Sequence, residues 1–413
     1  MGKRIWIVNA QTGSPEKVAN PRYLEFAKYF MAAGYDVITF NSSQREGIEV
    51  PNGKYLEKQY GEYRFVHVFT PKFVGNGIKR MYALYKFAHN LYKNCNSFEK
   101  PDVILHNIHP PFDYPVVRLA KKLKVKYVAE AWDLWPESFV RFGLISESNP
   151  LMKIAHAIEK RYYYSANEIV FTLKGAIDYI SMNGWTKDKG GRIDISHIHY
   201  INNGIDLELF DTNSKKYPRP DEDINNPNII KIVYLGSVNK ANNVKTLVDA
   251  AALLKDLPEY KFFIYGNGAY RQELMEFVQN KHIDNVVFKE KRISLAECAW
   301  VVSQATVNVM NYEKVFGKWG VSSGKMFLYL AAGKPIVCNI NIAYDNVIRD
   351  NELGVAINIS TPEAFAQAIR NCAEQPSYKY QGMCERVRKT AEQFDYKKLA
   401  AEELKVIEAA LAS

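Results

Sequence analysis

The sequence predicts an α/β protein with two doubly wound domains, each a mostly parallel sheet covered by helices on both faces. Apolar runs of strand length alternate with helical patterns in two separate series. Such alternation specifies a parallel sheet, because each crossover connection places its helix on a face of the sheet. With 413 residues and 47% hydrophobic residues, the chain is long enough to bury two cores.

The first series opens with the apolar run at residues 4–8, which is expected to form a buried strand. A helix over 21–33 follows, and a second strand over 36–40 comes after Gly34. The remaining strands of this series are expected over 64–69, 103–106, 125–130, 168–172 and 197–201.

Residues 211–228 break this alternation. They contain three prolines, several acids and several asparagines, a composition typical of a polar connection between domains. Within them, Asp221-Glu222-Asp223 matches a metal-binding Asp-x-Asp pattern in form, but no apolar strand precedes it. A solvated loop is the simpler interpretation, and we expect no metal there.

The second series begins directly afterwards with a strand over 230–235 and a helix over 244–254. The rest of it is expected as helices over 271–281 and 295–303 and strands over 261–265, 285–288, 306–310 and 335–339. Ligands of doubly wound sheets bind outside the carboxyl ends of the strands. The loops that follow strands are therefore the places where functional residues are expected.

The pattern of residues 322–337 predicts a helix that ends near Gly333 and is followed by a strand. It also predicts an anion site at the start of that helix. Two serines are N-cap candidates, a glycine lets a ligand approach the backbone, and a lysine adds positive charge to the free amides of the first turn. These residues are Ser322, Ser323, Gly324 and Lys325. Gly333 is expected to end the helix. A diphosphate would fit here, although an ordinary capped helix with a solvated lysine gives the same pattern.

This helix resembles the donor-binding helix of the retaining, family 4 nucleotide-sugar glycosyltransferases of GT-B fold. Residues 201–210, INNGIDLELF, resemble the interdomain signature of the same family. The resemblance covers nearly the whole chain and implies two Rossmann-like domains that face each other across a cleft. It implies an acceptor-binding domain over 1–210 joined by a C-terminal helix over 393–413, a linker over 211–228, and a nucleotide-sugar-binding domain over 229–392.

The resemblance also implies the donor-side residues. Lys240 replaces the family's basic residue that faces the donor pyrophosphate, and Lys325 completes the pair. A departing nucleoside diphosphate gains negative charge, which fixed cations stabilise without a metal or another cofactor. The resemblance further indicates Gly236 and Gly266 in loops after strands, and Arg292 where relatives hold the nucleobase. Gly13 is a candidate from the residues alone, because its small polar loop after the first strand could approach a sugar or phosphate closely.

Residues 130–137, EAWDLWPE, place three carboxylates and two indoles at the end of a predicted strand. Aromatic faces and carboxylate acceptors suit a sugar ring and its hydroxyls. The alternative is that the tryptophans are core anchors and the acids cap the next helix. The segment resembles that of family members that build bacterial surface polysaccharides. Asp133, Glu137 and His109 are the catalytic candidates on the acceptor side, and the spacing of His106 and His109 alone does not indicate zinc.

Two positions depart from the family pattern. Leu328 stands where the family has a ribose-binding glutamate, and Gly320 stands at the position of an earlier acid. A leucine cannot accept a hydroxyl hydrogen bond. These departures suggest one alternative to a transferase, a catalytically silent glycosyltransferase-like binding subunit. A second alternative is a GT-B nucleotide-sugar 2-epimerase, which has the same phosphate cradle and would act without an acceptor.

Because both basic donor positions persist, we expect an active enzyme. The resemblance implies transfer of a sugar from a nucleoside diphosphate, with UDP as the expected nucleotide, to a hydroxyl of a lipid-linked glycan with retention of configuration. Its setting, by analogy with relatives, is surface polysaccharide biosynthesis, as for a capsule or exopolysaccharide.

The net charge of +9 is concentrated in part over residues 72–93, which also show apolar residues at helical spacing. With Lys79, Arg80 and Lys86 as flanking charges, this composition suits a helix on an anionic membrane surface. An amphipathic core helix with a solvated basic side is the alternative. No apolar run reaches the length of a membrane span. We expect a cytoplasmic protein, peripheral on the inner face of the membrane, without a nucleic-acid partner.

Overall fold

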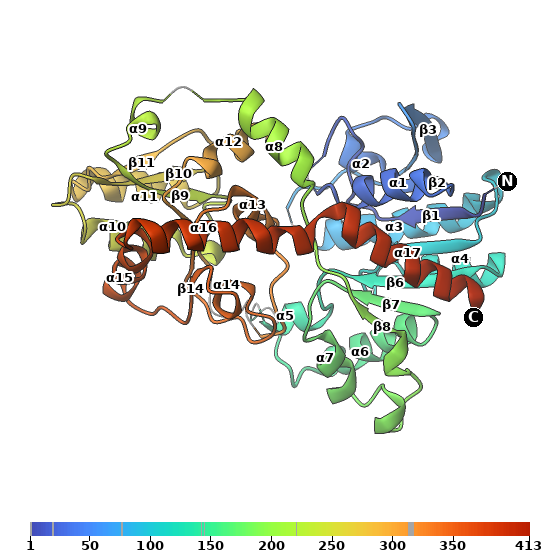
Figure 1. Cartoon of the computed structure of the whole chain (residues 1–413). Helices are drawn as coiled ribbons and strands as arrows, with labels where there is room; N and C mark the ends of the chain where they lie inside the picture. The colour runs from blue at the N-terminus through green and yellow to red at the C-terminus, as the bar shows by residue number, and fades with distance from the viewer. Residues whose placement is uncertain are drawn as a thin grey trace. The chain divides into compact units, whose positions relative to one another are not determined.

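The chain folds into two compact units (Figure 1). The first contains the residues up to Asn202 together with Tyr396–Ser413, and the second contains Asn203–Asp395. The structure, a computed structural model, describes residues 2–18, 20–75, 77–141, 143, 145–219, 221–312 and 318–413. The described residues of 211–228, the predicted linker, lie in the second unit and include the end of the helix Leu207–Lys216 and the whole of the helix Glu222–Asn225.

The first unit contains an eight-stranded sheet in the order β3-β4-β2-β1-β5-β6-β7-β8. Its strands are β1 Arg4–Val8, β2 Asp36–Ser42, β3 Tyr55–Tyr60, β4 Tyr63–Val68, β5 Val103–Asn107, β6 Lys126–Ala131, β7 Glu168–Phe171 and β8 Ile198–Tyr200. All neighbouring strands are parallel except the β3–β4 hairpin. The sequence did not predict β3, because its polar residues face solvent at the sheet edge.

Helices cover this sheet and bury its apolar side chains. They are α1 Arg22–Ala32, α2 Ser43–Glu46, α3 Ile78–Asn94, α4 Tyr114–Leu123, α5 Glu137–Arg141, α6 Pro150–Tyr163, α7 Ala176–Met182 and α17 Tyr396–Ala412. The C-terminal helix α17 returns to the first unit, where it packs with α1 in one apolar cluster (Figure 1). Apolar residues at helical spacing explain this packing, since both helices present one buried stripe.

The second unit contains a six-stranded sheet in the order β11-β10-β9-β12-β13-β14, with every pair parallel. Its strands are β9 Ile230–Leu235, β10 Tyr260–Tyr265, β11 Val286–Phe288, β12 Val307–Met310, β13 Ile336–Cys338 and β14 Gly354–Ala356. Its helices are α8 Leu207–Lys216, α9 Glu222–Asn225, α10 Val244–Ala252, α11 Arg271–Asn280, α12 Leu295–Ser303, α13 Gly324–Ala332, α14 Val347–Asp350, α15 Pro362–Ala373 and α16 Ser377–Ala391. Two doubly wound sheets confirm the predicted fold class. Among the described residues, none of the helices has the length and apolar character that a membrane span requires.

A buried ion cluster anchors the last residues of the first unit before the chain crosses to the second. Arg22, Glu130 and Glu403 are each fully buried. Arg22 Nε donates to Glu130 Oε1 at 2.7 Å, and its two terminal nitrogens donate to the carbonyls of Ile201 and Asn202. Glu130, one of the three carboxylates predicted to face a sugar, is thus part of an internal ion pair, which corrects that prediction.

Glu403 is the second acid of this cluster. Its Oε2 lies 3.7 Å from a terminal nitrogen of Arg22, and neither carboxyl oxygen has a hydrogen-bond partner within the described residues. Burial, together with the charge of Glu130, raises the pKa of Glu403 well above its ordinary value. A raised pKa favours the neutral form of Glu403, and Glu130 is the nearer acid to Arg22.

Removal of the Arg22 charge should destabilise the fold strongly. Arg22→Met leaves the Glu130 carboxylate buried without its cation, which typically costs about 3–5 kcal/mol. The control is Arg4→Met, because the Arg4–Asp36 pair lies at the surface and such pairs contribute about 1 kcal/mol or less. Urea unfolding measures both, and equal losses in the two variants would contradict the proposed energetic role of the cluster.

Candidate active site

The loops after β9 and β10 meet through two glycines at the carboxyl edge of the second sheet. Gly236 N donates to the Tyr265 carbonyl at 3.0 Å. A Cβ atom on Gly266 would lie 1.8 Å from the Gly236 carbonyl oxygen, and Gly266 adopts φ +131°. Only glycine allows both the close approach and this backbone conformation. The two predicted donor-side glycines therefore lie together.

Helix α13 begins and ends as predicted, but its serines do not cap it. Ser323 occupies the N-cap position and Gly333 ends the helix with φ 62°. The Ser323 Oγ accepts from the Tyr312 hydroxyl at 2.6 Å instead, and the Ser322 Oγ accepts from Asn203 Nδ2 at 2.9 Å. The predicted capping contacts are wrong, because both side chains are held by residues distant in sequence. Within the described residues, no side chain caps the first-turn amides of α13.

The ammonium group of Lys325 is enclosed beside Gly236. Its Nζ lies 4.8 Å and 4.7 Å from the ring centroids of Tyr234 and Tyr312. A Cβ atom on Gly236 would lie 3.1 Å from this Nζ. Among the described residues Nζ has no hydrogen-bond partner, and burial lowers the pKa of Lys325 to about 8. A cation removed from water without an acid partner is a favourable site for an anion.

The other donor-side candidates lie at the surface of the second unit. Lys240 is exposed in the loop after β9, with its Nζ 5.8 Å from the ring centroid of Tyr270. Arg292 is exposed after β11. Gly324 is also exposed, and no described atom lies within 4 Å of the position of a Cβ there. Their exposure leaves Lys240, Arg292 and Gly324 accessible from solvent.

Sequence analysis missed Arg271, the first residue of α11. Its side chain is buried, and one terminal nitrogen donates to the Gly266 carbonyl at 2.8 Å while the other donates to the Lys289 carbonyl. Burial lowers the pKa of Arg271. The guanidinium therefore holds the loops after β10 and β11 together. The sequence contained one signal for this role. A cation in the first turn of a helix is repelled by the positive end of the helix dipole, so its presence indicates another contact.

The two positions that depart from the family pattern, Leu328 and Gly320, lie in surroundings that do not suit an acidic side chain. Leu328 is partly buried and packs against an apolar cluster of the second unit. Gly320 is buried and adopts φ 103°, a conformation that an acidic side chain would strain. A carboxylate at either position would therefore disturb local packing or backbone.

The acids of the Asp-x-Asp pattern are paired with lysines instead of being solvated. Asp221 caps α9 by accepting from two backbone amides, and it also pairs with Lys289. Asp223 pairs with Lys261. The expectation of a solvated loop is thus wrong. Across the part of the chain that the structure describes, no group of three or more metal-ligating side chains is found.

In the first unit, the loops after β5 and β6 meet through aromatic contacts. His109 follows β5, and its ring lies edge-to-face against Trp135 with centroids 5.9 Å apart. Asp133 is exposed in the loop after β6, and half-buried Glu137 begins α5. The structure therefore brings His109 to the predicted acceptor segment. Trp132, in contrast, packs with the core, as the alternative interpretation expected.

Gly13 lies in the loop after β1, on the same edge of the first sheet. A Cβ atom on Gly13 would lie 2.1 Å from the carbonyl oxygen of Lys17, so the turn itself requires glycine. The Glu46 carboxylate accepts from the amide and hydroxyl of Ser14 at 2.7 Å and 2.8 Å and fixes the loop. The local fold thus accounts for Gly13 without a ligand.

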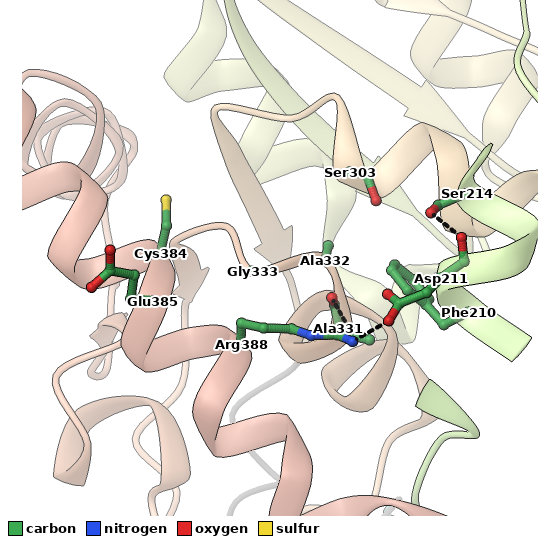
Figure 2. A pocket seen from close by; sticks show the side chains of 10 residues that line it. All are labelled: Phe210, Asp211, Ser214, Ser303, Ala331, Ala332, Gly333, Cys384, Glu385 and Arg388. Carbon is green, nitrogen blue, oxygen red and sulfur yellow. Dashed lines mark hydrogen bonds and ion pairs between the residues drawn. The ribbon is translucent and has the colours of Figure 1, made fainter. Parts of the chain in front are cut away.

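A surface pocket of about 380 Å³ is lined in part by Ala331, Ala332 and Gly333 at the C-terminal end of α13 (Figure 2). Lys325 lies in the first turn of the same helix. There Arg388 of α16 donates to the Ala331 carbonyl at 2.7 Å and to the Asp211 carboxylate at 2.6 Å (Figure 2). None of the sequence-predicted site residues lines this pocket. Its polar contacts fix the C-terminal end of α13 and its position against α8.

The chain is similar to known glycosyltransferases in part of its sequence and in its fold. Residues 230–375 match the family described as glycosyl transferases group 1. No curated protein matches the chain significantly. Among solved structures, a glycosyltransferase from Rickettsia africae is 15% identical, with 99% of both chains covered and a TM-score of 0.65.

Two further solved structures are similar over almost the whole chain. Anabaena HepE, in complex with UDP and glucose, is 14% identical with a TM-score of 0.64, covering 98% of this chain and 99% of its own. A UDP-forming α,α-trehalose-phosphate synthase from Burkholderia xenovorans is 11% identical with a TM-score of 0.72, covering 99% of both chains. At these identities the likeness shows the fold, and it confirms the GT-B fold class.

Lys325→Met should stabilise the ligand-free protein at neutral pH. The pKa of Lys325 is lowered from 10.5 to about 8, so below pH 8 the folded chain carries a buried cation, which methionine removes. Each pKa unit corresponds to about 1.4 kcal/mol, and we expect a gain of about 1–3 kcal/mol at pH 7. Between about pH 8 and 10.5 the unfolded state binds more protons, so the stability of the wild type rises with pH and the gain shrinks.

Urea unfolding at pH 7 and pH 9 measures this difference. Lys240→Met is the control, because Lys240 is exposed and its replacement removes no buried charge. A loss of stability in Lys325→Met at pH 7 would show that the two tyrosine rings more than offset the burial of the ammonium.

Proposed function

We propose that this glycosyltransferase of GT-B fold transfers a sugar from a nucleoside diphosphate to a hydroxyl of an acceptor glycan, with retention of configuration. One observation carries the proposal: the Lys325 ammonium is enclosed beside Gly236 at the start of α13, without an acid partner in the described residues. This residue lies within the span that matches glycosyl transferases group 1. UDP is the proposed nucleotide, and the Anabaena complex with UDP supports that choice.

The donor diphosphate is proposed to bind at the first turn of α13. Backbone amides at a helix start attract anions, and Lys325 adds a full charge in a poorly solvated place. Lys240 supplies a second cation from the loop after β9. Together they would stabilise the negative charge that develops as the nucleotide departs. The proposal assigns Gly236, Gly266 and Arg292 to the same donor side and requires no metal.

The acceptor is proposed to bind at the edge of the first sheet. His109, Asp133 and Glu137 supply polar groups, and Trp135 supplies an aromatic surface for a sugar ring. In the mechanism that the family resemblance implies, the donor phosphate takes the proton of the acceptor hydroxyl. The protein then contributes alignment and electrostatic stabilisation.

The proposed acceptor is a lipid-linked glycan of surface polysaccharide biosynthesis, and the outer face of α3 supports a membrane partner. Ile78, Tyr82 and Tyr85, at helical spacing, are 83%, 54% and 42% exposed. Lys79 and Lys86 flank this outer face, and α3 contains no acid. Exposed apolar groups bordered by cations fit an anionic bilayer. Arg80, predicted to join them, is half-buried.

Lys325→Ala and Lys240→Ala should each weaken UDP binding by about ten- to a hundredfold, the value of a charge-assisted hydrogen bond. Titration calorimetry with UDP measures the affinity. Lys245→Ala is the matched control, because Lys245 pairs with Asp249 and lies over the Phe277 ring. Unchanged affinity in both test variants would remove the proposed donor site.

Turnover assays distinguish the proposed function from its two alternatives. Wild-type protein is incubated with a panel of nucleotide sugars, with and without a membrane lipid extract. Nucleotide release that requires the extract supports transfer. Sugar interconversion without extract would identify the epimerase, and UDP binding without turnover would identify the silent subunit, which the packing of Leu328 favours.

Lys79→Gln/Lys86→Gln should reduce sedimentation with vesicles of phosphatidylglycerol and phosphatidylcholine. Each cation near an anionic surface contributes about 1 kcal/mol. The control is Leu151→Ser/Ile154→Ser, which removes exposed apolar groups, 63% and 57% exposed, from a different helix of the same unit. Equal sedimentation of the lysine variant and the wild type would refute membrane binding through α3.

A further inference from the structure

Asp113 occupies the N-cap position of α4 but does not cap that helix. An aspartate at this position ordinarily accepts a hydrogen bond from a first-turn amide. Here the side chain makes no such bond, although it is 4% exposed and directly precedes the helix. The carboxylate is turned toward the loop that carries His109. Because the Asp113 side chain does not cap the helix, a contact elsewhere must determine its orientation.

The Asp113 carboxylate is the centre of a hydrogen-bond network. Its Oδ2 lies 3.2 Å from His109 Nδ1 and 3.1 Å from His106 Nε2, and it accepts from the His109 amide at 2.8 Å. Its Oδ1 accepts from the Tyr162 hydroxyl at 2.9 Å. On the far side of His106, Nδ1 lies 2.9 Å from the Tyr127 hydroxyl. Both carboxylate oxygens therefore accept hydrogen bonds. The network fixes the loop after β5 through the backbone amide and the imidazole of His109.

These contacts determine where the proton of each imidazole lies. Burial by itself raises the pKa of Asp113, but the facing histidines and their hydrogen bonds hold that pKa below its ordinary value. A carboxylate anion can only accept hydrogen bonds, so His109 Nδ1 must be the donor. When His109 carries a single ring proton, its lone pair is therefore on Nε2. His106 faces the same carboxylate through Nε2, so its proton on that side lies on Nε2 and not on Nδ1.

We propose that Asp113 is a positioning residue that holds His109 with Nδ1–H toward the carboxylate and Nε2 directed to the acceptor hydroxyl. The inference rests on the proposed function, which assigns His109 to the acceptor side. Nε2 accepts a hydrogen bond from the hydroxyl and orients its oxygen, without retaining the proton. The Trp135 ring, edge-to-face against His109, restrains the imidazole from a second direction. A group fixed by its neighbours in this way costs little entropy when it engages the substrate.

Glu159 provides a matched comparison within the same unit. Glu159 is fully buried, and its partners are one histidine and two tyrosines, where Asp113 has two histidines and one tyrosine. His156 Nδ1 lies 3.1 Å from its carboxylate, and the hydroxyls of Tyr163 and Tyr179 donate to it at 3.1 Å and 2.7 Å. None of these three hydrogen-bond partners is itself a candidate site residue, although Tyr179 interacts electrostatically with Glu137. Replacement of Glu159, whose pKa burial raises, should therefore affect stability alone, whereas replacement of Asp113 should also affect turnover.

Asp113→Asn is the test variant, with Glu159→Gln as its control. We expect Asp113→Asn to lower kcat for transfer by about ten- to a hundredfold, the cost of misplacing a group that aligns the substrate. Donor affinity and the KM for acceptor should stay near wild type. Glu159→Gln should leave kcat unchanged. Wild-type kcat in Asp113→Asn, or an equal fall in both variants, would overturn the proposal.

A second measurement does not depend on turnover. Nitrogen-15 NMR of the wild-type imidazoles should show His109 as the Nδ1–H tautomer, and Asp113→Asn should populate the other tautomer. An Nε2–H tautomer in the wild type would overturn the proposal even if Asp113→Asn fails to fold. If the wild type transfers no sugar, the proposed function fails, while the NMR result still decides whether Asp113 orients His109.

Discussion

Parallel pairing places the carboxyl ends of neighbouring strands at one edge of each sheet, and the candidate residues depend on that edge. In the second unit the register pairs Leu235 of β9 with Tyr265 of β10, so the residues that follow, Gly236 and Gly266, meet. Their backbones approach so closely that no side chain fits between them. The compact turn leaves the Lys325 side chain room beside Gly236. Strand register thus sets the position of the cation.

The chain treats this cation differently from the enclosed cations that face acids. Arg22 faces Glu130, and the half-buried lysines near α9 face Asp221 and Asp223. Lys325 lies over two tyrosine rings, and no acid within the described residues bonds to it. Keeping it there lowers the stability of the ligand-free fold. Removal of the ammonium from water also strengthens its attraction to an arriving anion. Desolvation of Lys325 thus explains both the lower stability of the fold and the affinity for an anion.

In the first unit, carboxylates near the same sheet edge have three different environments. Glu130 lies inside the core with Arg22, Asp113 faces two histidines, and Asp133 is exposed. A carboxylate is the same chemical group in each place, but its partners decide whether it stabilises the fold, orients a neighbour or contacts solvent. Proximity in sequence to a strand end therefore does not assign a function to an acid.

The sequence by itself determined the two doubly wound sheets, the limits of α13 up to Gly333, and the loops that carry the candidate residues. These features follow from apolar periodicity and from glycine conformation, which are local properties. Only the tertiary structure decided that Tyr312 engages Ser323, that Arg22 withdraws Glu130 from the surface, and that Asp113 turns away from α4. Each of these depends on a side chain brought close by packing of other elements, and no local pattern encodes that proximity.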